Sequence, residues 1–159
     1  MKTHDLDLTA DYIDVRDVIA RYEELESERQ NWVDVAADAK ETYESSKSAD
    51  DLQGLADEMD RTEQSVKDWD EDEGQEFAQL TALLEDLKGN GGDEQWRGDW
   101  YPVTLIRDSY FETAMDDLLE DIGELPKDLP CYLKITVDYD ALQMDYTSTE
   151  IDGETYWYR

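Results

Sequence analysis

Few residues of this sequence could carry out covalent or metal chemistry. His4 is the only histidine and Cys131 is the only cysteine, so a nucleophile and its base would require the fold to bring these two together. Residues 68–76 begin like a calcium-binding loop, but Glu73 stands where such a loop needs glycine and Gln79 stands where Ca²⁺ needs a bidentate glutamate. We therefore expect no catalytic residue, no metal site, no cofactor and no enzymatic activity.

Carboxylates are the functional group that this sequence has in abundance. The 159 residues include 44 Asp and Glu against 14 Lys and Arg, which gives a formal net charge of −30. Soluble domains usually carry a net charge of only ~2–8 in magnitude. Because polyanions repel one another, we expect no direct binding to nucleic acid or to an anionic membrane. The seventeen aromatic residues argue against disorder over most of the chain.

The sequence also bears on location. No apolar run approaches the ~18 residues that are needed to span a bilayer. The first residues contain no apolar stretch of the kind found in secretion signals, so we expect a cytoplasmic protein.

The first half of the chain has the apolar spacing of helices. Apolar residues recur three and four apart over residues 15–43 and 52–87, as they do on one face of a coiled-coil helix. The serine-rich residues 45–48 separate the two stretches, and Ser48 is the expected N-cap of the second. We expect a bend or break around residues 71–74. Because both stripes are narrow, this helix pair is expected to need another partner, either the C-terminal part or a second copy of the chain, so a homodimer stays open.

The second half has a mixed pattern. We expect strands over residues 100–106 and 132–137, a helix that starts at Asp108 and stops at Gly123, and a helical turn at residues 138–144. Asp152 and Gly153 lie between two β-branched and aromatic runs, which predicts a β-hairpin with a type I′ turn.

Glycine marks the boundary between these halves. Three glycines and an asparagine at residues 89–92 form the strongest chain breaker in the sequence. We therefore expect an α+β protein made of a lead segment (residues 1–13), an acidic antiparallel helical hairpin (14–88), a glycine-rich linker (89–95) and a small α/β unit that ends in a β-hairpin (96–159).

The acids of the expected hairpin have the linear density of DNA phosphates. Eleven acids fall within the 24 residues from Asp50 to Glu73. A helix of that length is ~36 Å long, so one carboxylate falls every ~3.3 Å, whereas each DNA strand has one phosphate per ~3.4 Å of axis. A Lys/Arg-lined DNA-binding surface would be attracted to such a row. The phosphate-mimicking candidates are Asp57, Glu58, Asp60, Glu63, Asp68, Asp70, Glu71, Asp72, Glu73 and Glu76, followed by Asp116, Asp117, Glu120 and Asp121.

The charge could also have an origin unrelated to DNA. A surface adapted to high salt, or to solubility in general, would be rich in aspartate and poor in lysine, of which there are only seven. Alternatively, the chain could be a helical adaptor or assembly protein whose acidity is incidental to its binding. Both origins stay open.

The C-terminal segment resembles a known family. The elements Asp138-Tyr-Asp-Ala and Asp152-Gly-Glu-Thr-Tyr, together with residues 104–111 and 118–123, stand in the order found in ArdA-type antirestriction proteins of bacteriophages and mobile elements. The match covers roughly residues 96–159. It implies an elongated acidic dimer that imitates DNA and blocks type I restriction–modification enzymes.

Residues 1–92 do not align with that family, so a CRISPR effector with a basic DNA channel is as reasonable a target. We therefore expect an inhibitor of a host defence nuclease, which acts as a DNA mimic on a basic DNA-binding surface in the host cytoplasm.

Overall fold

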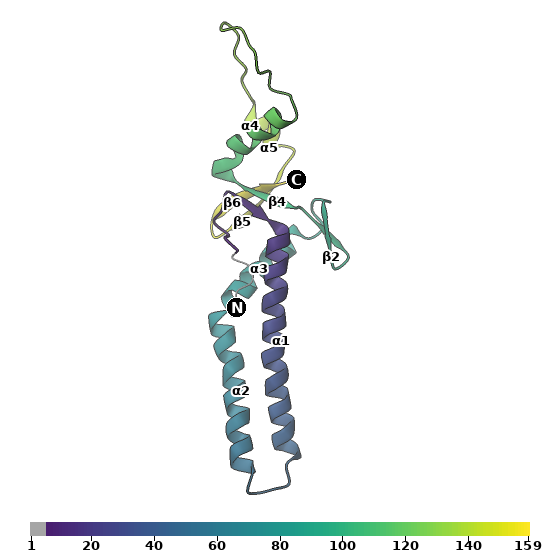
Figure 1. Ribbon diagram of the computed structural model, residues 1–159, viewed down its shortest axis with the longest axis vertical. Coiled ribbons are helices and arrows are strands. Elements are labelled where there is room, and N and C mark those ends of the chain that lie inside the picture. Colours follow the sequence, from purple (N-terminus) through teal and green to yellow (C-terminus); the bar gives the residue numbers. More distant parts are fainter. Residues whose placement is uncertain (1–5) are drawn as a thin grey trace. The chain divides into compact units, whose positions relative to one another are not determined.

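The computed structural model describes residues 6–159 and has an α+β fold, as predicted (Figure 1). Its helices are α1 (Val15–Ser45), α2 (Leu52–Asp72), α3 (Gly74–Leu87), α4 (Phe111–Asp121) and α5 (Tyr139–Gln143), with a 3₁₀ turn at Asp108–Tyr110. Its strands are β1 (Tyr12–Asp14), β2 (Glu94–Trp96), β3 (Asp99–Tyr101), β4 (Thr104–Arg107), β5 (Thr147–Ile151) and β6 (Glu154–Tyr158). None of the described helices combines the length and the apolarity that crossing a bilayer requires.

The chain divides into two compact units. The helical unit comprises Ile19–Ala82, and the sheet unit comprises Met1–Val18 together with Leu83–Arg159. This grouping differs from the division expected from the sequence, because the beginning of the chain joins the C-terminal part. The boundaries between the units fall inside α1 and α3.

The helical unit is an antiparallel hairpin, as predicted. α1 and α2 lie side by side, and the turn at residues 46–51 joins them (Figure 1). Early residues of α1 contact late residues along the returning chain: Tyr22 stacks on Phe77 with ring centroids 5.1 Å apart, and Arg29 Nε donates to Asp70 Oδ1 over 3.0 Å. The predicted break is also confirmed, because α2 ends at Asp72 and α3 begins at Gly74.

The predicted N-cap of the second helix is wrong. α2 starts at Leu52, and Asp51 occupies the N-cap position without a side-chain hydrogen bond. Ser48 falls inside the connection between the helices. The turn between two antiparallel helices needs several residues to reverse the chain, so the helix starts later than the serine signal indicates.

The sheet unit contains four antiparallel strands in the order β1-β4-β6-β5. Leu105 of β4 and Tyr156 of β6 are fully buried in its core. Asp152 and Gly153 join β5 to β6 with φ angles of 50° and 81°, and both angles are positive, as a type I′ turn requires. The predicted hairpin is therefore confirmed.

Residues 12–14, at the end of the expected lead segment and the start of the expected hairpin, form a strand of this sheet. Ile13 of β1 pairs with Leu105 of β4. The single O–H of Tyr156 is shared between the carbonyls of Leu8 and Ala10, whose oxygens lie 2.9 and 3.1 Å from the hydroxyl oxygen. Backbone groups at the edge of β4 need partners, and residues 12–14 provide them.

The expected strand over residues 100–106 is interrupted. The structure has β3 and β4 on either side of Pro102, which is buried and has no N–H to donate to a ladder. β3 pairs instead with β2, which was not predicted from the sequence. Residues 89–95 are packed against this hairpin: Gly89 N donates to Trp100 O over 2.9 Å, and a Cβ on Gly91 would lie 2.7 Å from Pro102 N.

The expected strand over residues 132–137 is wrong, because these residues form no strand. A strand needs a neighbour for its backbone groups, and among residues 6–159 none pairs with this segment. In Figure 1 the chain between α4 and α5 projects from these helices as a long loop. The expected helix before Gly123 is confirmed with a later start, because residues 108–110 form a 3₁₀ turn and α4 begins at Phe111. Gly123 follows α4 at a φ of 77°. The expected helical turn is α5, and Asp138 caps it by accepting from Ala141 N over 3.1 Å.

Candidate functional site

A buried arginine holds the two sides of the helical hairpin together. Arg21 of α1 is 2% exposed, and its guanidinium bonds Glu76 through Nε at 2.8 Å and through Nη2 at 2.9 Å. Nη1 also donates to Glu24 over 2.7 Å, and Nη2 lies 3.5 Å from Glu73. The hydrogen bonds to Glu76 raise the pKa of Arg21 above its ordinary value, so the side chain stays charged. We call this arrangement the Arg21 cage.

A groove lies next to this cage, between α1 and α2. We call it the Trp32 groove. Its volume is about 340 Å³, and its lining includes Glu28, Trp32, Asp68, Trp69, Asp72 and Glu73. The side chain of Trp69 is buried and its indole Nε1 donates to Glu28 over 3.4 Å, whereas Trp32 is 39% exposed. None of the lining residues is basic. The groove therefore combines an open aromatic face with carboxylates.

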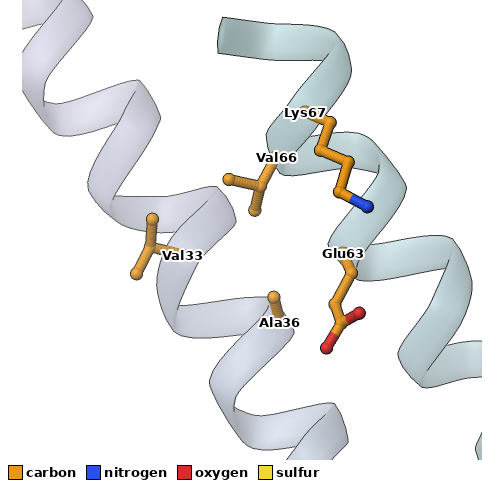
Figure 2. Close-up of a pocket in the computed structure, with 5 residues that line it drawn as sticks. All are labelled: Val33, Ala36, Glu63, Val66 and Lys67. Carbon is orange, nitrogen blue, oxygen red and sulfur yellow. The ribbon is translucent and has the colours of Figure 1, made fainter.

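A second groove lies farther along the same helix pair. Figure 2 shows its lining, in which Val33 and Ala36 come from α1 and Glu63, Val66 and Lys67 come from α2. Its volume is about 310 Å³. Small side chains such as Ala36 leave this space, which is the structural consequence of the narrow apolar stripes.

The phosphate-mimicking candidates on α2, at its C-cap and in the first turn of α3 fall into two sets. Four of them form ion pairs with arginine: Glu73 and Glu76 with Arg21, Asp70 with Arg29 at 3.0 Å, and Glu58 with Arg61. Among residues 6–159, no ion pair engages the other six, which are exposed: Asp57, Asp60, Glu63, Asp68, Glu71 and Asp72.

Four of the six share one face of α2, away from the buried Thr62 and Trp69, and Asp68 also lines the Trp32 groove. The four are spaced three, eight and three residues apart, and these intervals keep them on the same side of a helix: Asp57, Asp60, Asp68 and Glu71. Gln64 fills the gap, and its side-chain amide donates to Asp68 over 2.8 Å, while Gln53 donates in the same way to Asp57 over 2.9 Å. These i,i+4 bonds help to fix two carboxylates on the helix surface.

The second group of candidates lies on α4 in the sheet unit. Asp117, Glu120 and Asp121 are exposed. Asp116 is half-buried and accepts a hydrogen bond from the hydroxyl of Tyr139 over 2.7 Å. This bond raises the pKa of Tyr139 above its ordinary value and gives Asp116 a structural contact within the fold.

Of the two residues considered for covalent chemistry, the structure places only Cys131. Cys131 is exposed in the loop between α4 and α5, and His4 lies outside the described residues. Within residues 6–159, no group of three His, Cys, Asp or Glu side chains is arranged to hold a metal ion.

The roles of Arg21 and Trp32 were not predicted from the sequence. Arg21 was not singled out, although a charged residue one position before the apolar Tyr22 in a lean seam could have indicated a buried ion pair. Trp32 lies within residues 15–43, where the apolar spacing predicts a seam residue and nothing more. No sequence signal gives its exposure, because that depends on how closely α2 approaches.

Comparison of the chain with known protein families, curated proteins and solved structures finds no match. The resemblance to the ArdA-type proteins therefore stays a prediction.

Proposed function

We propose that this protein inhibits a host defence nuclease, either a restriction–modification enzyme or a CRISPR effector, by occupying its basic DNA-binding surface as a DNA mimic. The observation that carries the proposal is the set of six exposed carboxylates on α2 that no ion pair among the described residues engages. The site of action would be the host cytoplasm.

Two rows of exposed carboxylates on one hairpin support mimicry, although the row on α2 is less dense than a DNA strand. Residues 57 to 72 span ~22 Å of helix, so the six carboxylates of this stretch fall one every ~4.5 Å. This is sparser than the phosphates of one DNA strand, at one per ~3.4 Å. On α1, the exposed Asp34, Asp38 and Glu41 add a second row on the same hairpin.

The rigidity of the carrier also supports it. A flexible acidic segment would lose conformational freedom on binding, whereas these carboxylates stand on a helix that the Arg21 cage and the Tyr22–Phe77 stack hold in a hairpin. The mechanism we propose is competition: the carboxylates take the place of phosphates on the Lys/Arg side chains of the nuclease, and DNA is excluded.

The test uses two matched variants. The first replaces Asp57, Asp60 and Asp68 by Asn and Glu71 by Gln; the control replaces the exposed Glu112, Glu124 and Glu150 by Gln and Asp128 by Asn, which changes the net charge equally. Tagged full-length protein is used to capture proteins from a host lysate at low salt, and duplex DNA is added to elute them. Captured nuclease is then assayed for DNA cleavage with each variant.

We expect DNA to elute the partner, and binding to weaken at least tenfold between ~50 and ~200 mM salt, as for DNA itself. The first variant should lose inhibition while keeping its helical circular dichroism, and the control should keep inhibition. A partner that DNA cannot displace, or equal inhibition by both variants, would contradict mimicry through α2.

An adaptor role is the second candidate, and one observation favours it. The loop between α4 and α5 exposes apolar side chains, with Tyr132 at 82% and Leu133 at 52% exposure. A partner held by these residues would bind with little dependence on salt. If the charge instead reflects adaptation to salt, the protein should unfold at low ionic strength, where repulsion is unscreened.

A further inference from the structure

We propose that the Trp32 groove binds an arginine side chain of the partner protein, with the guanidinium stacked on the indole of Trp32 and bonded to the carboxylates of Asp68 and Asp72. This inference rests on the proposed function and deepens it: the rows of carboxylates attract any cationic surface at a distance, and the groove selects arginine on contact.

The shape and charge of the groove point to a cation that also has an apolar face. Trp32 is 39% exposed, so part of its ring is open to a partner. Asp68 and Asp72 both line the groove from α2, and Asp68 Oδ1 accepts from Gln64 over 2.8 Å. Among the described residues no hydrogen bond or ion pair engages Asp72. An anion would be repelled by these carboxylates, and a purely apolar group would leave them desolvated without a partner.

The hairpin already holds a guanidinium between carboxylates one step along the same seam. In the Arg21 cage, α1 and the returning chain surround Arg21 with Glu24, Glu73 and Glu76. Glu73 also lines the Trp32 groove, so the two arrangements share a carboxylate. The Arg21 cage is filled by the chain's own arginine, and the neighbouring groove offers the corresponding groups to a partner.

A second contact in this protein illustrates the stacking. In the sheet unit, the guanidinium carbon of Arg97 lies 4.4 Å from the ring centroid of Trp96. A planar guanidinium can stack on an indole and donate in its plane to carboxylates at the same time, whereas a lysine ammonium is a compact, strongly hydrated point charge. The combination of an open indole and carboxylates therefore favours arginine over lysine.

The experiment measures this preference with two probes of equal charge. A peptide of eight arginines and a peptide of eight lysines are titrated into the full-length protein at physiological salt, and binding is followed by calorimetry. Indole N–H signals of the ¹⁵N-labelled protein are recorded in parallel, and the Trp32 signal is identified by its loss in Trp32→Leu. Circular dichroism checks the fold of every variant.

We expect the arginine peptide to bind about three- to tenfold more tightly than the lysine peptide. This ratio corresponds to the usual strength of one cation–π contact. The Trp32 indole signal should shift with the arginine peptide. In Trp32→Leu, which keeps an apolar side chain without the π face, the two peptides should bind within about twofold of each other. The double variant Asp68→Asn, Asp72→Asn, with Trp32 intact, should reduce the shift of the Trp32 signal.

The matched control is Val35→Ala, which truncates an equally exposed side chain of the same helix outside the groove, also 39% exposed. It should keep the arginine preference. The proposal is overturned if the preference persists in Trp32→Leu, or if the Trp32 signal stays in place while the peptide binds. These peptide measurements involve no nuclease, so failure of the arginine site and failure of DNA competition are read from separate assays.

Discussion

The Arg21 cage should be the largest single contribution of a charged residue to the stability of the hairpin. We consider Arg21→Met, which keeps an unbranched apolar stem and removes the guanidinium. The Arg21 side chain is 3% exposed, while Glu24, Glu73 and Glu76 are 17%, 33% and 32% exposed. Removing one partner of a fully buried ion pair costs about 3–5 kcal/mol, because the other charge is left desolvated and unpaired.

Here the carboxylates keep part of their contact with water, which lowers the cost, and we expect about 2–4 kcal/mol. The matched control is Arg29→Met, on the same helix. Arg29 and Asp70 are 43% and 46% exposed, so this pair should contribute no more than about 1 kcal/mol. Urea unfolding followed by far-UV circular dichroism gives both values. If the free energies of unfolding of the two variants differ by less than about 0.5 kcal/mol, the burial of Arg21 does not stabilise the hairpin as argued.

Two further predictions concern the sheet unit. Burial raises the pKa of Tyr156 above its ordinary 10.0, so its contribution to stability is complete below pH ~10 and is lost as the pH rises through the folded-state pKa. Urea unfolding at pH 8 and 11 should show this loss of stability. Tyr156→Phe should reduce the loss, and it should cost about 1–2 kcal/mol for the hydrogen bond that its hydroxyl shares between Leu8 and Ala10. Equal stability of the wild type at pH 8 and pH 11 would contradict this prediction. Gly91→Ala should destabilise by about 2–4 kcal/mol, because Gly91 has a φ of +76° and an added Cβ would meet Pro102 N at 2.7 Å. Gly92→Ala is the control, because an added Cβ there has no atom within 4 Å. Equal midpoints of urea unfolding for the two variants would refute the steric argument.

Local patterns predicted the parts of the fold that depend on neighbours in sequence. The three-and-four spacing indicated α1 and the pair α2 and α3, and the Asp152-Gly153 turn indicated the β5–β6 hairpin, because in each case the residues that make the contacts lie close together in the chain. Strand pairing across long distances was not accessible in this way. β1 is only three residues long, and its pairing with β4 joins positions about ninety residues apart, so its sequence contains no signal of its partner.

The segment at residues 132–137 shows the converse case. Tyr132, Leu133 and Ile135 have strand propensity and alternate, but propensity alone does not form a strand when no neighbouring backbone is available. For the candidate site, composition predicted that carboxylates carry the function, and the structure separates them. Glu73 and Glu76 hold the hairpin together through Arg21, whereas Asp60 and Glu71 make no such contact.

This separation gives the charge of the hairpin a physical interpretation. The helical unit contains 20 acids and six bases, and like charges three or four residues apart on a helix destabilise it by a few tenths of a kcal/mol per pair. The carboxylates bound to Arg21 and Arg29 offset part of this repulsion by stabilising the contact between the helices. The unpaired ones on the outer face of α2 do not, so neutralising them should stabilise the isolated protein slightly while weakening its binding to a cationic partner. A variant in which Asp57, Asp60, Asp68 and Glu71 are neutralised should therefore melt at or above the wild-type temperature; a lower melting temperature would mean that these carboxylates serve the fold itself.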